Sequence, residues 1–478
     1  MLAILAGSVA AGDAGAPTLV ACTAVAPLMA LALAPAVRER LVAPGPADLV
    51  IVVGLTLVLA ANFVVIGDLA RLLGLTGAHG LVAGAVVALL VIAWRACDAW
   101  WGAVGLLGVG AIIGAIVLVA PSGGAPWTVW AALASRPALT FDPGSTWVAG
   151  GRSLGERTTL TFSEPHRVVA ASASTWRVSE DGPARAHVRE WRVGAGDALT
   201  LRPGDQLTLE RGARVRFEAG RRIPTAPTSG MAWADGPVQP VLHRLVGVLG
   251  VAVTLVAGGL MLAPARVTPP GWGAAVGVPI VAGSFVVVGA LWGLYGIALV
   301  PELALVPRAL APISEALELV GGALWRPVLL TGLAAGVAAL LVGTLLTWRL
   351  RVMEALRTAA GAIGRPELSD ATLASVGGGL VIAAAAIGLR DDDPWNLFAH
   401  GLGLIVAGAL APRVAGGGPR SELTGAIVGI VVFAGIAMEG GRWPLAATFT
   451  HHPVLAAAPA AWLAARVTRR APARSVSR

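Results

Sequence analysis

The stretch DLVIVVGLTLVLAANFVVIG, residues 48–67, decides the fold class of this chain. After its initial aspartate it carries no charged side chain. An α-helix of this length crosses the roughly 30 Å of hydrocarbon in a bilayer. A charge at the bilayer centre costs about 2.5–3.5 kcal/mol, so uncharged runs of this length are typical of helices that face lipid. The stretch therefore predicts a transmembrane helix.

The rest of the chain repeats this pattern. Further apolar segments lie at 17–36, 80–95, 100–120, 242–263, 273–299, 327–347, 373–389, 395–411, 423–439 and 453–467. The chain is 56% hydrophobic and 13% charged, about half the charged fraction of a soluble domain. The sequence predicts an α-helical polytopic membrane protein with about eleven transmembrane helices, embedded in a lipid bilayer. Within 373–389, the glycine run 377–379 is a candidate unwound site.

One long insertion has a different character, from about Trp127 to Trp233. Its centre reads TWRVSEDGPARAHVREWRVGAGDALTLRPGDQLTLERGARVRFEAG, residues 175–220. Short alternating runs (WRV, HVREWRV, ALTL, QLTL and RVRF) are separated by EDGP, GAGD, RPGD and ERGA, which suit tight turns. Strands at this spacing predict an inserted all-β domain, a sandwich or a barrel. No nucleophile or metalloprotease motif occurs in it.

Arginines in the short loops predict the orientation. Arg38, Arg95, Arg266, Arg357 and Arg413 all fall on one side if the chain alternates through eleven spans. Positive loops face the cytoplasm, so the N-terminus and the β domain are predicted outside a bacterial-type inner membrane, with the C-terminus inside. The predicted regions are helices 1–4 in 1–120, the extracytoplasmic β domain in 121–240, helices 5–6 in 241–300, an amphipathic interfacial segment in 301–326, helices 7–11 in 327–467 and a basic cytoplasmic tail in 468–478.

The basic balance of the chain does not indicate nucleic-acid binding. All 35 residues counted as Lys+Arg are arginines, and they are scattered along the sequence rather than gathered into one stripe. The two cysteines, Cys22 and Cys97, lie outside the predicted β domain, so no disulfide framework is expected there.

Four histidines are candidates for a metal or haem site. His243, His400, His451 and His452 map to the outer half of the membrane in the predicted topology. Imidazoles from different helices can bind haem, copper or zinc. The alternative is that they are solvated or hydrogen-bonded histidines at the interface, since no HxxxH spacing places two ligands on one helix. Whether any cofactor binds stays open at this point.

Two asparagines are candidate polar groups within the membrane. Asn62 falls near the middle of one span, and Asn396 lies near the start of another. Intramembrane polar side chains often mark functional sites, although an interhelical hydrogen bond explains Asn62 equally well. Asp393 is expected to cap a helix that begins at Pro394.

Three classes of function fit these observations. The first is a non-catalytic membrane subunit or scaffold of a multiprotein envelope or membrane complex, in which the β domain binds protein partners. The second is a transporter or permease, which usually has polar groups at the midplane. The third is a membrane-embedded enzyme, or a metal- or haem-binding protein, acting at the outer interface. Helices rich in small residues with almost no polar lining favour the first class.

Overall fold

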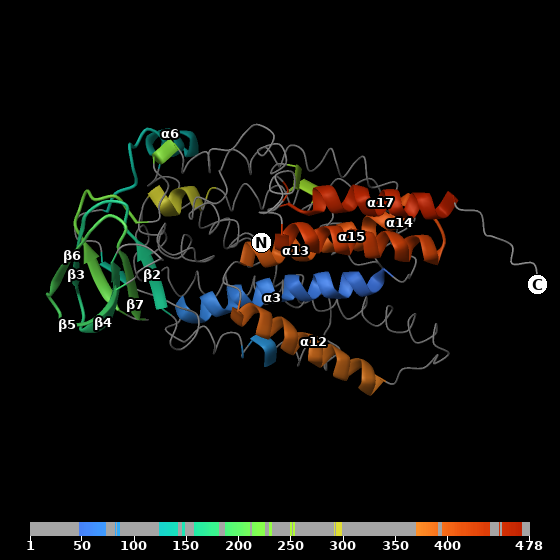
Figure 1. The fold of residues 1–478 in the computed structure, drawn as a ribbon, viewed down its shortest axis with the longest axis horizontal. Coiled ribbons are helices and arrows are strands. Elements are labelled where there is room, and N and C mark those ends of the chain that lie inside the picture. The colour runs from blue at the N-terminus through green and yellow to red at the C-terminus, as the bar shows by residue number, and fades with distance from the viewer. Residues whose placement is uncertain are drawn as a thin grey trace, which may run out of the picture.

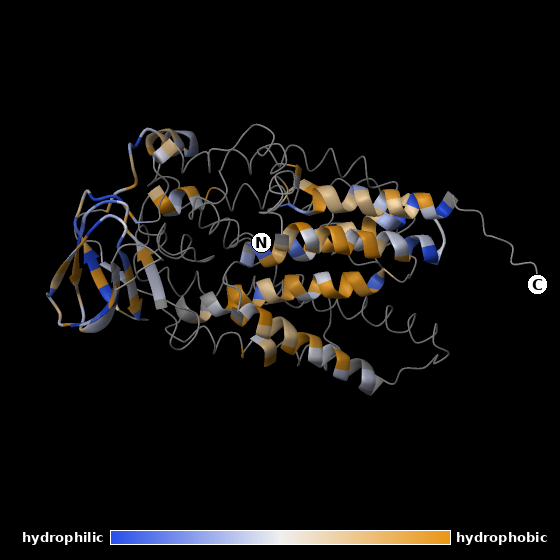
Figure 2. Ribbon diagram, in the orientation of Figure 1, coloured by the Kyte–Doolittle hydropathy of each residue, from blue (hydrophilic) through white to orange (hydrophobic). Residues whose placement is uncertain are grey.

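The computed structural model consists of a group of long helices and, at one end of an elongated molecule, two β-sheets (Figure 1). The structure describes residues 47–72, 124–141, 146–148, 157–180, 187–210, 213–224, 370–390, 394–439 and 452–470, with shorter pieces at 82, 84–86, 229–231, 249–250, 252–253, 291, 293–298 and 449. The long helices are largely hydrophobic, whereas hydrophilic and hydrophobic residues alternate in the sheets (Figure 2).

Among the described residues, three helical stretches are long and apolar enough to cross a membrane: Asp48–Gly67, Asn396–Ala415 and Pro419–Met438. They coincide with the predicted spans 48–67, 395–411 and 423–439, so the membrane class is supported. Two further predicted spans correspond to α12 (Asp370–Arg390), which contains a shorter apolar stretch, and to α17 (Val454–Arg470). The remaining predicted spans and the segment 301–326 lie wholly or mostly outside the described residues, and the number eleven stays a prediction.

The candidate span Asn396–Ala415 is made of three consecutive elements. It begins with α13 (Pro394–Ile405), passes through one π-helical stretch, η2 (Val406–Leu410), and ends with α14 (Ala411–Ala415). Pro412 lacks an N–H, and its ring collides with the carbonyl four residues earlier in a regular α-helix. The wider π turn directly before it accommodates this residue. Gly416, with a φ of 70°, ends the helix in a conformation that glycine adopts without strain.

Glycines let the helices approach backbone to backbone. A Cβ on Gly54 of α3 (Asp48–Leu72) would lie 2.5 Å from the carbonyl oxygen of Gly401 on α13. The reverse also holds, since a Cβ on Gly401 would lie 2.6 Å from the carbonyl oxygen of Gly54. A Cβ on Gly425 of α15 (Pro419–Glu439) would lie 2.8 Å from the carbonyl oxygen of Ala461 on α17. This close packing is what small residues permit between membrane helices.

The glycine run 377–379 does not interrupt its helix. The described helix α12 continues through all three residues from Asp370 to Arg390. The prediction of an unwound site there was wrong. Glycine lowers helix propensity by about 1 kcal/mol per residue, but regular backbone hydrogen bonds along the segment outweigh this cost.

The β region (residues 139–223) contains eight described strands in two four-stranded antiparallel sheets. The strands are β1 (Thr146–Val148), β2 (Arg157–Thr161), β3 (His166–Ala170), β4 (Ser174–Glu180), β5 (His187–Val193), β6 (Ala198–Leu201), β7 (Gln206–Glu210) and β8 (Arg214–Phe217). The five strands expected from alternation are β4 to β8, so those predictions are confirmed. The RPGD turn is confirmed as well, because Gly204 has a φ of 95° and the Asp205 carboxylate accepts the Arg202 N–H at 2.7 Å.

The strand order is β1-β8-β3-β6 in one sheet and β2-β7-β4-β5 in the other. Every connection except β4–β5 therefore carries the chain from one sheet to the other. This is the order of a jelly roll, in which two Greek keys are interleaved. Each sheet buries one face, with Trp176, Leu207 and Leu209 in one sheet and Val168 and Val215 in the other almost inaccessible to solvent.

The insertion begins with a helix rather than a strand. Residues Pro126–Ala134 form α6, with the proline in its first turn and Val129 and Leu133 buried. The expectation that β character starts at Trp127 was wrong. Proline at the first helical position costs nothing, because its missing N–H would have no partner there. The first backbone pairing of the β region follows later, as the bridge between Thr140 and Arg222.

Candidate functional site

Strand β5 lies at the edge of its sheet, as far as the structure describes it, and carries exposed apolar side chains. It is the last strand of its described sheet and pairs only with β4. Val188 is 60% exposed and Trp191 is 41% exposed. The backbone groups on the far side of an edge strand have no strand partner, which makes such a strand a template for another chain. Charged residues usually protect such edges, and β5 carries Glu190 and Arg192, but the exposed valine and tryptophan add apolar surface beside them.

The position of Trp191 follows from the register of the sheet. Trp191 is paired with Trp176 of β4, so both side chains lie on the face that is buried in the middle of the sheet. Trp176 is completely buried, whereas Trp191 remains partly exposed because it lies on the last strand. The opposite face of β5 carries Val188 and Glu190, and Glu190 forms an ion pair of 3.5 Å with Arg177. Apolar surface is thus available on both faces of the edge.

A second cluster holds the two ends of the β region together. The incoming segment (139–141) and the outgoing segment (220–223) are joined by three backbone hydrogen bonds, each 2.9 Å long. They run from the Phe141 N–H to the Arg221 carbonyl, from the Gly220 N–H to the Phe141 carbonyl, and from the Ile223 N–H to the Leu139 carbonyl. The ring of Phe141 also stacks on Phe217 with 4.3 Å between centroids. This pairing closes the β region where it joins the rest of the chain.

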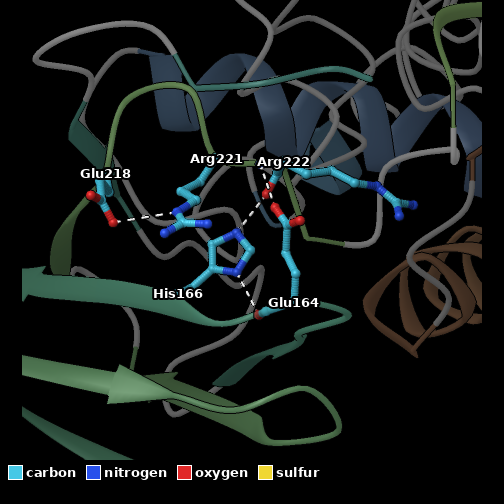
Figure 3. Close-up of polar contacts among 5 residues, drawn as sticks. All are labelled: Glu164, His166, Glu218, Arg221 and Arg222. Atoms are coloured by element: carbon cyan, nitrogen blue, oxygen red, sulfur yellow. Dashed lines mark hydrogen bonds and ion pairs between the residues drawn. The ribbon is translucent and has the colours of Figure 1, made fainter. Parts of the chain in front are cut away.

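The side chains of Glu164 and His166 form hydrogen bonds with the backbone of the outgoing segment at Arg222 (Figure 3). The Arg222 backbone N–H donates to the Glu164 carboxylate at 2.8 Å. The Nε2 atom of His166 lies 2.6 Å from the Arg222 carbonyl oxygen, and its Nδ1 lies 2.8 Å from the Glu164 carbonyl oxygen. His166 is 1% exposed and begins β3. The sequence did not single out this histidine, because nothing in its neighbours predicts that the distant residue 222 returns to it.

The histidines predicted as metal ligands are brought together only in part. His400 of α13 contacts Phe433 of α15 edge to face, with centroids 5.8 Å apart. Gly403, one turn later, lies against both Phe433 and Val454, and His452 precedes Val454 by two residues. His400 and His452 therefore belong to the same end of the helix group, where His452 also packs on Gly250. His243 and His451 lie outside the described residues. Within the described ranges, no three His, Cys, Asp or Glu residues gather as metal ligands.

The two asparagines occupy different environments. Asn62 is 2% exposed in α3, and its Nδ2 has no hydrogen-bond partner among the residues that the structure describes. Asn396, in the first turn of α13, is exposed. The helix begins at Pro394 as predicted, whereas the proposed capping residue Asp393 lies outside the described ranges. A buried hydrogen-bond donor without a partner lowers the folding stability by about 1–3 kcal/mol, which makes Asn62 the more unusual of the two asparagines.

Sequence reasoning missed a buried charge cluster at the other end of the helices. Arg413 of α14 donates from one guanidinium nitrogen to Asp48 of α3 at 2.7 Å, and from Nε to Glu422 of α15 at 2.9 Å. The side chains of Arg413 and Asp48 are 3% and 0% exposed, and that of Glu422 is 17% exposed. The only signal in the sequence was that the predicted topology places all three residues at cytoplasmic span ends.

Comparison with known proteins finds that no family model and no curated protein matches this chain.

Proposed function

We propose that this protein is a non-catalytic integral membrane subunit or scaffold of a multiprotein envelope or membrane complex, and that it binds a protein partner through the edge of β5. The observation that carries the proposal is the exposed edge strand with Val188 and Trp191. The three apolar helices support a membrane location. The arginine distribution supports a β region outside the cytoplasm, in a bacterial-type inner membrane.

The partner is best described as an extended polypeptide segment. An added strand would pair with the outward backbone groups of β5, and side chains on alternate positions would supply specificity. Val188 and Trp191 point to opposite faces, so an apolar residue on either face of the added strand gains contact. Arg192, exposed next to Trp191, favours an acidic side chain in the partner. This combination of backbone pairing and an aromatic anchor is typical of a specific interface rather than a catalytic cleft.

The proposal is tested by photo-crosslinking in native membranes. A photoreactive amino acid at position 188 or 191 should yield a discrete adduct with one partner, whose mass identifies it as another protein or a second copy of this chain. The same amino acid at Arg216, exposed on the outer face of the other sheet, is the matched control and should give no such adduct. Val188→Lys should abolish the adduct formed from position 191. If position 191 gives no adduct while the protein is folded, the β5 edge is not the partner site.

A transporter is the second candidate, and one observation favours it. The unpaired Nδ2 of Asn62 lies inside a membrane-spanning helix, where a transported solute with an acceptor group would satisfy it. Reconstituted vesicles that accumulate a solute in a manner lost on Asn62→Leu would support transport. Unchanged uptake in that variant would show that Asn62 takes no part in transport.

A further inference from the structure

Both ring nitrogens of His166 lie against backbone carbonyl oxygens, those of Glu164 and Arg222 (Figure 3). The distances, 2.8 and 2.6 Å, are those of hydrogen bonds. The residue is 1% exposed, so water does not replace either contact. The tilted ring of Phe162, with centroids 5.0 Å apart, covers it further.

These contacts fix which form of the imidazole fits. A carbonyl oxygen only accepts hydrogen bonds, and a neutral imidazole carries a single N–H. A neutral His166 would therefore set the lone pair of one ring nitrogen against a carbonyl oxygen in a buried site, which is unfavourable. The imidazolium carries two N–H groups and satisfies both oxygens with charge-assisted hydrogen bonds. A proton on each nitrogen therefore satisfies the closed arrangement better than a proton on one of them.

The charged groups named around the ring come from the β2–β3 connection and from the outgoing side of the β region. Glu164, from the β2–β3 connection, places its carboxylate on the backbone N–H of Arg222 and favours a cation nearby. The guanidinium of Arg221, from the outgoing segment, disfavours a positive charge on the imidazole. This guanidinium is paired with the Glu218 carboxylate at 3.4 Å, which reduces the repulsion. The side chain of Arg222 extends away from the ring (Figure 3). The local charges therefore do not oppose a protonated His166.

We propose that Glu164, His166 and the Arg222 backbone form a proton-dependent clamp on the outgoing segment of the β region. With His166 protonated, the Arg222 backbone is held at both its N–H and its carbonyl, and residues 220–223 stay paired with 139–141. The closed clamp binds one proton more than the open clamp, so acid stabilises closure. As pH rises and the proton is lost, closure weakens.

The consequence lies at the junction between the β region and the helices. The incoming and outgoing segments are the two strands by which the β region continues into the rest of the chain. Opening them would free the sheets to reorient while the cores of both sheets stay intact. The clamp makes the orientation of the β region sensitive to the pH of its compartment. It does not depend on the partner proposed for β5.

Hydrogen exchange on the full-length protein in detergent tests the clamp. Protection of a peptide covering residues 220–224, corrected for intrinsic exchange and divided by that of β7, should fall roughly tenfold or more between pH 5.5 and 8. The exchange of the His166 C2 hydrogen, followed in the same samples, reports its titration directly and should share the same midpoint. A protection ratio that does not change with pH, or a midpoint different from that of His166, overturns the proposal.

Two variants separate His166 from Glu164. His166→Gln cannot titrate, so its protection ratio should be independent of pH. Glu164→Gln keeps both the backbone carbonyl and an amide oxygen that accepts from Arg222, so the dependence on pH should persist. If the dependence persists in His166→Gln or vanishes in Glu164→Gln, the histidine is not the sensor. Should His166→Gln fail to fold, the matched midpoints in the unaltered protein and in Glu164→Gln decide.

Discussion

Replacing Arg413 with methionine should strongly destabilise the helical part of this protein. The substitution keeps much of the side-chain volume but removes the cation that pairs with Asp48 and Glu422. Asp48 is fully buried, so its carboxylate would lose the guanidinium that it pairs with in a medium of low dielectric constant. Removing one partner of a buried pair costs about 3–5 kcal/mol. We expect the lower half of that range, since Glu422 is partly exposed and can be solvated.

The measurement is unfolding in mixed detergent micelles, followed by tryptophan fluorescence. Arg420→Met is the matched control, because it makes the same chemical change at an exposed arginine at the start of α15 and should alter stability by less than about 0.5 kcal/mol. The double variant Asp48→Asn with Arg413→Gln replaces the closest charged pair by neutral hydrogen-bonding groups and should recover most of the loss. Equal stabilities for Arg413→Met and Arg420→Met would refute the reasoning.

The remaining predictions concern helix contacts and the buried polar groups. Gly401→Ala should lower the yield of folded protein, because the new Cβ would lie 2.6 Å from the Gly54 carbonyl oxygen. Gly435→Ala is its control, because a Cβ on Gly435 meets no described atom within 4 Å. This control variant should stabilise α15 by up to about 1 kcal/mol in thermal unfolding. Ser421→Ala should cost about 1–3 kcal/mol, since its buried hydroxyl donates to a carbonyl of α17 at 2.7 Å. Asn62→Leu should raise the unfolding midpoint by removing a buried unpaired donor, and a lower midpoint would show that this amide has a partner in the folded protein.

The sequence determined the elements whose signals are local. An uncharged run such as 48–67 has one stable conformation in a bilayer, because every backbone polar group must be satisfied within the segment. Alternation in residues 175–220 determined five strands, since a side-chain period of two places one face in the core. The start of α13 at Pro394 was also predictable from the chemistry of a helix N-terminus.

Only the tertiary structure decided what depends on distant partners. Strand order was one such feature: the short runs predict strands, but pairing β3 with both β6 and β8 is a property of the closed core. Asp48 and Arg413 are separated by 365 residues and meet because glycines bring α3 and α13 into contact. His166 likewise acquires its two acceptors only when residue 222 returns to the start of β3. A local pattern sets the conformation of its own segment, whereas hydrogen-bond partners and buried charges are set by which segments the folded chain places side by side.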